Sequence, residues 1–163
     1  MVHVVNRGNE RRALFDQPRD YDEFLRFLDL ALERRPMRLL AYVLMPNHWH
    51  MVLWPSAPLD LSRFLHYLTT LHALHFRQVS GTTGSGHVYQ GRYRSTLVDT
   101  DVRYARTIRY VEANPLRARL VPRAEDWPWS SLAERVRCDR RVVDGPFLLP
   151  PPGDWAAFVN RRD

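Results

Sequence analysis

The chain of 163 residues carries a formal net charge of +6 and is 45% hydrophobic, which suits one soluble domain with its own core. Its longest apolar run, Leu39 to Pro46, is too short to span a bilayer, and the N-terminus lacks the basic start and long apolar core of a signal peptide, so we expect a cytoplasmic protein. The single cysteine, Cys138, excludes an internal disulfide and a cysteine-based zinc site, which leaves histidine, amide and carboxylate side chains to bind any metal.

The first third of the chain predicts a strand, a helix and a hairpin. Residues 3–7 are typical of a short strand, and Asp20 and Glu23 have the spacing of a capping box that opens a helix. This helix is expected to end near Pro36. Two apolar runs with a Pro-Asn hinge between them follow over residues 39–54, and they predict a buried hairpin.

The middle of the chain predicts a helix, a strand and a further helix. An amphipathic helix is expected over residues 59–79, and three of its residues are interpreted as surface or boundary histidines: His66, His72 and His75. A flexible glycine-rich loop at residues 80–86 is too irregular for a nucleotide-binding fingerprint, so no nucleotide cofactor is expected. A strand is predicted within residues 87–98, and residues 99–101 cap a third helix that Pro115 stops.

This order of elements predicts an α+β fold of the ferredoxin-like or RRM-like kind. In such a sandwich an antiparallel sheet of four to five strands carries two helices on one face, and here a third helix reaches the otherwise free face. We expect residues 1–131 to form this domain. Residues 132–163 are predicted to be an irregular tail that packs on the domain, with Phe147 among its contacts.

The hairpin carries a pair of histidines on one face. His48 and His50 lie two residues apart in its second strand, so they point the same way, whereas Trp49, Met51 and Leu53 point towards the helices. Buried imidazoles without partners cost free energy, and histidine is the commonest side-chain metal ligand, which favours half of a metal site. The alternative is a pair of core histidines with backbone partners.

The positive charge is concentrated in one stretch. All 24 basic residues are arginine, a bias that a GC-rich genome explains, but between His87 and Arg123 eight arginines stand against three acids. That stretch holds +5 of the total charge of +6. Concentrated arginine favours a polyanion such as nucleic-acid phosphate. A solvated basic helix is the alternative.

The third helix presents a polar face. At about 100° per residue, Tyr104 falls on the apolar side of the helix and Tyr110 on the opposite side, with Asn114 close to Tyr110 in projection. Arg103 and Arg106 share that side. The face therefore offers a hydroxyl, an amide and two cations. The alternative is an exposed tyrosine and an asparagine that ends the helix.

Together, the histidine pair and this face predict a metal-assisted phosphoryl transfer. Two neutral imidazoles and one amide oxygen would bind a divalent cation without cancelling its charge, which lets the cation polarise a phosphodiester. Tyr110 would attack a DNA phosphate to give a 5′-phosphotyrosine and a free 3′-hydroxyl. Tyrosine ordinarily has a pKa of about 10, so the metal or arginines must favour its phenolate. No dedicated general base is evident.

Three separated motifs resemble those of the REP-associated tyrosine transposases. The members of that family are transposases of the insertion-sequence-200-like type. They belong to the HUH nuclease superfamily and use a single tyrosine. The motifs occur in the family's order: His48-Trp49-His50 after residues 42–47, the segment at residues 89–95, and the segment at residues 110–118. The resemblance extends from about residue 3 to residue 131.

The resemblance implies cleavage and rejoining of single-stranded DNA at hairpins such as repetitive extragenic palindromes, with Mg²⁺ or Mn²⁺. His48 and His50 match the metal-binding pair, and Tyr110 matches the nucleophile. Asn114 matches the polar third ligand, where related transposases have glutamine. These relatives include dimers that exchange the third helix, so both a monomer and a homodimer stay open.

Single-stranded DNA is expected along the free face of the sheet. Four arginines would bind its phosphates: Arg92, Arg94, Arg103 and Arg106. Trp54 or Tyr93 would stack on its bases. Such an enzyme would work in the bacterial cytoplasm, at the nucleoid when bound to DNA.

Two other functions fit the same residues. A regulator could bind hairpin DNA through this face without cutting it. A metal carrier could use the His-x-His pair alone, although the concentrated arginine charge argues against it.

Overall fold

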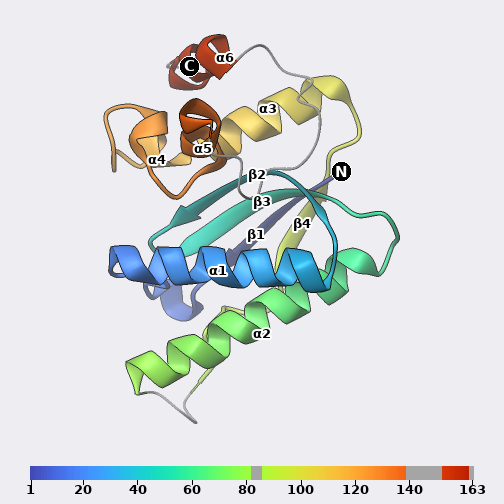
Figure 1. The fold of residues 1–163 in the computed structure, drawn as a ribbon, viewed down its shortest axis with the longest axis vertical. Coiled ribbons are helices and arrows are strands. Elements are labelled where there is room, and N and C mark those ends of the chain that lie inside the picture. Colours follow the sequence, from blue (N-terminus) through green and yellow to red (C-terminus); the bar gives the residue numbers. More distant parts are fainter. Residues whose placement is uncertain (82–85, 139–151, 162–163) are drawn as a thin grey trace.

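Four antiparallel strands form a single sheet in the order β2-β3-β1-β4. The structure, a computed structural model, describes residues 1–81, 86–138 and 152–161 (Figure 1). The strands span these residues: β1 Val2–Arg7, β2 Arg38–Met45, β3 His48–Trp54 and β4 Arg94–Leu97. The predicted hairpin is β2 and β3, and β1 lies at the centre between β3 and β4. This order confirms the ferredoxin-like sheet.

Two long helices cover one face of the sheet, as predicted. They are α1 (Pro18–Arg34) and α2 (Asp60–Ser80), and both lie below the sheet in Figure 1. Trp49, Met51 and Leu53 of β3 are fully buried in the core that these helices share with the sheet. The predicted alternation of side chains along β3 is therefore confirmed: its apolar residues face the helices, and its histidines lie on the other face of the sheet.

Helix α1 begins earlier than predicted. Gln17 is its N-cap and Asp20 its third residue, and the two form the capping box that the sequence assigned to Asp20 and Glu23. Pro18 favours this start, because its fixed φ suits the first helical turn and its missing N–H is not needed there. Glu23 instead pairs with Arg26 on the surface of the helix, at 2.9 Å.

His72 is buried, so its expected place at the surface or boundary was wrong. Its side chain is 2% exposed, and its Nδ1 lies 2.6 Å from the hydroxyl of Tyr89. The indole Nε1 of Trp49 donates to the same hydroxyl at 3.4 Å. Helical periodicity cannot identify a polar residue that finds its partner inside the core. His66 is exposed, as expected.

The second face is covered over β2 and β3, rather than free beneath a single helix. Four helices lie above the sheet in Figure 1: α3 (Asp101–Glu112), α4 (Asn114–Arg117), α5 (Ser131–Arg137) and α6 (Pro152–Asn160). The described part of the chain also contains two single-turn 3-10 helices: η1 (Asn9–Arg11) and η2 (Ala124–Asp126). Helix α3 packs on β2 and β3 and encloses a second apolar core.

The segment that was predicted to be an irregular tail contains α5 and α6. Both helices pack on η2, and α6 also packs on α3. Phe147, expected among the tail contacts, lies outside the described residues, as do residues 82–85 of the glycine-rich loop. In the described ranges, no helix combines the length and the apolarity needed to cross a membrane. The division of the chain at residue 131 stays a prediction.

The predicted stop at Pro115 is also corrected. Helix α3 ends at Glu112, and Pro115 lies in the first turn of the short helix α4. A proline is tolerated there because the first N–H groups of a helix have no partner within it. The N-cap of α3 is Thr100, whose hydroxyl accepts from the backbone N–H of Arg103, within the capping segment that the sequence indicated.

A buried carboxylate attaches α3 to the rest of this layer. Glu112 is completely buried, and its two oxygens accept three hydrogen bonds. The donors are Arg135 Nε at 2.9 Å, Ser131 Oγ at 2.5 Å and Trp155 Nε1 at 2.6 Å. The Ser131 hydroxyl also accepts from the backbone N–H of Tyr42 in β2. One side chain thus connects α3 with α5, α6 and the sheet.

Replacing Glu112→Ala should lower the free energy of unfolding by about 3 to 5 kcal/mol, because it leaves the buried Arg135 cation without its counter-charge. Urea unfolding followed by circular dichroism measures the change. The matched control is Glu23→Ala, which removes an exposed ion pair and should cost less than about 1 kcal/mol. Equal losses in the two variants would contradict the role given to Glu112.

Candidate active site and nucleic-acid interface

The pairing of β1 with β3 brings polar side chains of both strands to one face. Val5 pairs with His50 and Arg7 with His48, and cross-strand partners project to the same side of a sheet. By the period of two, His3 joins them on that side. The face opposite α1 and α2 therefore carries two histidines from β3 with a histidine and an arginine from β1.

The two histidines among the predicted metal ligands are held in similar ways. Their ring centroids lie 5.1 Å apart. His48 Nδ1 is 2.7 Å from Oδ1 of Asn47, and His50 Nδ1 is 3.0 Å from Nε2 of His3. Because a neighbouring side chain engages each Nδ1, the Nε2 atoms are the ones suited to a metal.

Burial keeps both histidines neutral. Desolvation, with a smaller contribution from the charge of Arg7, lowers the pKa of His48 to about 4. Desolvation is also the main cause for His50, where His3, His48 and Arg7 add to it and the pKa falls to about 3. A neutral imidazole is the form that coordinates a metal, so the pair is in its ligand form near pH 7.

Tyr110 lies beside the histidines of its own chain. Its ring centroid is 5.7 Å from that of His50 and 6.0 Å from that of His3, both edge to face. The guanidinium of Arg117 lies over the Tyr110 ring, 5.5 Å from the centroid. Tyr110 is 41% exposed and Tyr104 is buried, as the helical projection predicted. The candidate nucleophile and the candidate ligands are thus close within one molecule.

Asn114 is anchored to the end of α3. Its Nδ2 donates to the backbone carbonyl of Tyr110 at 2.8 Å, and it belongs to the first turn of α4. The structure therefore ties the amide to the backbone of the candidate nucleophile. In the described parts of the chain, no group of three or more His, Cys, Asp or Glu residues is arranged to hold a metal. A metal bound by the histidine pair would need ligands of another type.

A cavity of about 630 Å³ opens in front of His50 and Tyr110. Four arginines contribute to its walls: Arg7, Arg11, Arg92 and Arg94. The remaining polar walls come from His3, Asn6, Gln90 and Thr96. A basic cavity next to a tyrosine hydroxyl suits a phosphate-bearing chain.

Two of the four predicted DNA-binding arginines, Arg92 and Arg94, line this cavity. Arg103 is not part of its wall, and it pairs with Asp99 at 3.1 Å. Arg106 is exposed on α3 and also lies outside the cavity wall.

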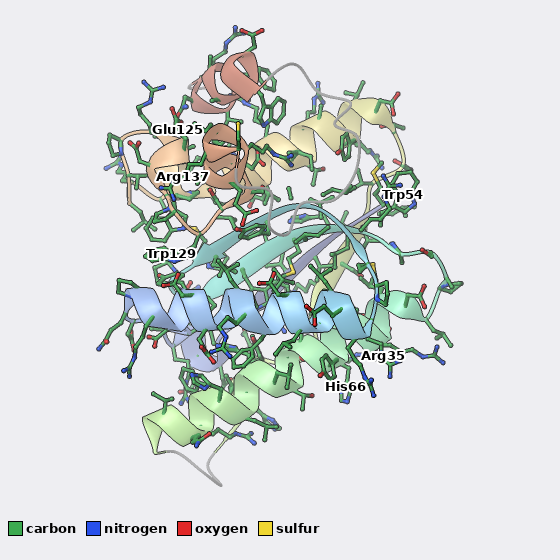
Figure 2. All side chains as sticks on the ribbon, in the orientation of Figure 1. Arg35, Trp54, His66, Glu125, Trp129 and Arg137 are labelled. Carbon is green, nitrogen blue, oxygen red and sulfur yellow. The ribbon has the colours of Figure 1, made fainter. Side chains whose placement is uncertain are left out.

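The two predicted stacking residues lie outside the cavity wall as well. Trp54 is 43% exposed where β3 ends, at the rim of the molecule in Figure 2, and the guanidinium of Arg38 lies 4.2 Å from its ring. The hydroxyl of Tyr93 lies 3.1 Å from Oγ of Ser62 on α2. Trp54 is therefore not a core residue.

Sequence reasoning missed the histidine and the two arginines that line the cavity near the N-terminus, namely His3, Arg7 and Arg11. His3 and Arg7 fall on one face of β1 by the period of two, a signal that becomes specific only when β1 is known to pair with the histidine strand. Arg11 belongs to η1, and no sequence pattern indicated where that turn would point.

The comparisons with known sequences point to one family. The family model "Transposase IS200 like" matches residues 1–114. The REP-associated tyrosine transposase of Escherichia coli (strain K12) is 26% identical over 160 residues, covering 96% of this chain and 84% of that protein.

Two solved structures share the fold. One is a REP-associated tyrosine transposase bound to a REP hairpin, with a TM-score of 0.68 and 20% identity over 92% of this chain and 88% of that one. The other is described as a transposase from Deinococcus radiodurans, with a TM-score of 0.51 and 16% identity over 68% of this chain and 87% of that one.

The neutral histidines should make folding stability depend on pH. Histidine in an unfolded chain has a pKa of about 6.5, whereas His48 and His50 have values of about 4 and 3 in the folded protein. Between these pKa values the unfolded chain binds more protons than the folded protein. The histidine pair therefore leaves the free energy of unfolding unchanged above about pH 6.5 and lowers it as the pH falls towards 4. Urea midpoints at pH 7.5, 6 and 5 measure the loss.

The variant His48→Ala/His50→Ala should show a shallower fall than the wild type, while the exposed-site control His66→Ala should keep the wild-type slope. His72 is unchanged in both variants, so its contribution cancels in the comparison. Parallel curves for all three proteins would contradict the assignment of the slope to the histidine pair.

Proposed function

Because this chain belongs to the IS200-like transposase family, and is therefore an enzyme that acts on DNA, we propose that it cleaves and rejoins single-stranded DNA at hairpins. The proposed intermediate is a covalent 5′-phosphotyrosine on Tyr110. One observation carries the proposal: the Tyr110 ring lies 5.7 Å from the ring of His50, at an arginine-lined cavity.

The proposed substrate is a hairpin such as a repetitive extragenic palindrome. Two observations support this substrate. The four arginines that line the cavity can bind phosphates, and a solved protein of the same fold is bound to a REP hairpin. We propose that four further residues contact DNA beyond the cavity, namely Arg103, Arg106, Trp54 and Tyr93. Acting on such DNA, the protein would work in the bacterial cytoplasm, at the nucleoid when bound.

The proposed cofactor is Mg²⁺ or Mn²⁺. His48 and His50 would hold it through their Nε2 atoms, and Asn114 through its amide oxygen, because the amide nitrogen is the atom bonded to α3. When bound, the cation polarises the phosphodiester and stabilises the departing alkoxide. Both imidazoles are already neutral and oriented, which supports the assignment.

In the proposed reaction, the Tyr110 oxygen attacks the phosphorus and the bond from phosphorus to the 3′-oxygen breaks. The tyrosine gives up its hydroxyl proton, and the 3′-oxygen takes one to leave as a hydroxyl. Attack by another 3′-hydroxyl reverses the step and joins strands. The Arg117 guanidinium lies over the Tyr110 ring, 5.5 Å from its centroid. Since all these groups come from one chain, a monomer can provide the complete site.

The variant Tyr110→Phe should abolish the covalent adduct. Incubation with a labelled hairpin and Mn²⁺ should give the wild type a slower band on a denaturing gel, and the variant none, because phenylalanine has no oxygen to attack phosphorus. The matched control Tyr104→Phe removes a buried hydroxyl on the same helix and should retain the adduct.

Loss of the adduct in Tyr104→Phe, with retention in Tyr110→Phe, would refute the assignment of the nucleophile. A wild type that binds the hairpin tightly in EDTA and forms no adduct would identify the protein as a hairpin-binding regulator instead.

The variant Arg92→Gln/Arg94→Gln should weaken hairpin binding and reduce its dependence on salt. Each phosphate contact to a single strand contributes about 0.7 to the slope of log K against log salt, so the slope should fall by roughly 1.4. Fluorescence anisotropy at several NaCl concentrations measures it. The control Arg26→Gln removes an arginine of α1, on the other side of the sheet, and an equal change there would contradict the binding surface.

A further inference from the structure

We propose that His3 is a positioning residue, which fixes the tautomer and ring orientation of His50 and thereby raises the affinity of the histidine pair for its metal. The proposal rests on the proposed function, because it concerns the same site. It assigns a role to a residue of β1 that the reaction itself does not use.

The contact between the two rings is close and well aligned. His3 Nε2 lies 3.0 Å from His50 Nδ1. The two rings are nearly parallel, with an interplanar angle of 10° and a centroid separation of 5.2 Å, so they lie edge to edge with the hydrogen bond in their common plane. His3 also lies edge to face with Tyr110. One side chain therefore contacts both the candidate ligand and the candidate nucleophile.

The backbone of His3 is fixed from both sides. Within the sheet, His3 pairs with Val52 of β3 and with Thr96 of β4. A residue of a central strand has neighbours that hold its main chain in place, so its side chain is a firm support for a neighbouring ring.

The chemistry of imidazole explains what this contact does. A neutral histidine that coordinates through Nε2 carries its proton on Nδ1, and that proton needs an acceptor. At His50 the acceptor is Nε2 of His3, whose own proton then sits on its Nδ1. At His48 the acceptor is Oδ1 of Asn47, at 2.7 Å. Both ligands thus have the arrangement in which an outer partner fixes the tautomer.

His3 acts through His50 and not as a third ligand. Its Nε2 faces His50 Nδ1, so the same nitrogen cannot also bind a cation. This agrees with the finding that the described residues hold no group of three histidine or acidic side chains arranged for a metal.

The test compares two substitutions that separate hydrogen bonding from packing. His3→Phe keeps a flat ring that can pack against Tyr110 but has no acceptor for the Nδ1 proton of His50. His3→Gln offers an amide oxygen at the level of the imidazole Nε2. The control is His66→Ala, which removes an exposed histidine on α2, in the layer on the other side of the sheet (Figure 2). Circular dichroism and urea midpoints of the full chain show that each variant is folded.

The main measurement is the affinity for Mn²⁺ alone, by isothermal titration calorimetry without DNA. His3→Phe should bind Mn²⁺ about 10- to 100-fold more weakly than the wild type. His3→Gln should recover most of that loss, and His66→Ala should match the wild type. Adduct formation by His3→Phe should also require more Mn²⁺ and approach the wild-type rate at saturation.

Three results would overturn the proposal. One is an unchanged Mn²⁺ affinity in His3→Phe, and another is a loss in His3→Gln as large as that in His3→Phe, which would indicate packing alone. In both cases the wild type still forms the adduct, and the proposed function stands. The third is a wild type whose Mn²⁺ binding is insensitive to His48→Ala/His50→Ala. That result removes the metal site of the proposed function, and the role of His3 with it.

Discussion

The hydrogen bonds of Glu112 are the interaction on which the site depends. A carboxylate without exposure to water is stable only when donors surround it, and here the donors come from α5 and α6. They fix the rotation of α3 about its axis. Tyr110 precedes Glu112 by two residues, about 200° around the helix, so fixing one side chain in the core turns the other towards the histidines. The hydrogen bonds that offset the free-energy cost of burying the Glu112 carboxylate thus also orient Tyr110, the candidate nucleophile.

The opposite half of the site is set by strand pairing. Because β1 lies between β3 and β4, its odd residues face the same side as His48 and His50, and a shift of one residue would turn all of them towards α1 and α2. The register therefore decides whether His3 and Arg7 meet the histidine pair. One half of the site is built on a rigid sheet, and the other on a helix held by a buried charge.

Much of this arrangement could be predicted from the sequence, because it follows from periodicity. The alternation in β3 placed His48 and His50 on one face, and the helical projection separated the buried Tyr104 from the exposed Tyr110. The remainder depends on contacts between distant segments. The burial of His72 requires Tyr89, the neighbours of His3 become known only from strand order, and the start of α1 was decided by Pro18. The covered second face depends in part on η2, α5 and α6, and the irregular composition of this part of the sequence concealed the two α-helices.

The hydrogen bond from Trp155 to Glu112 has a consequence for synthesis on the ribosome. The two residues are 43 positions apart, which at 5 to 20 residues per second means a delay of roughly 2 to 9 s. During that interval the strands and the first two helices have all been made, whereas the helix that carries Tyr110 still lacks one of the three donors to its buried carboxylate. The sheet that carries the histidine pair is thus made before Tyr110 is secured, and the candidate active site is complete only when α6 docks.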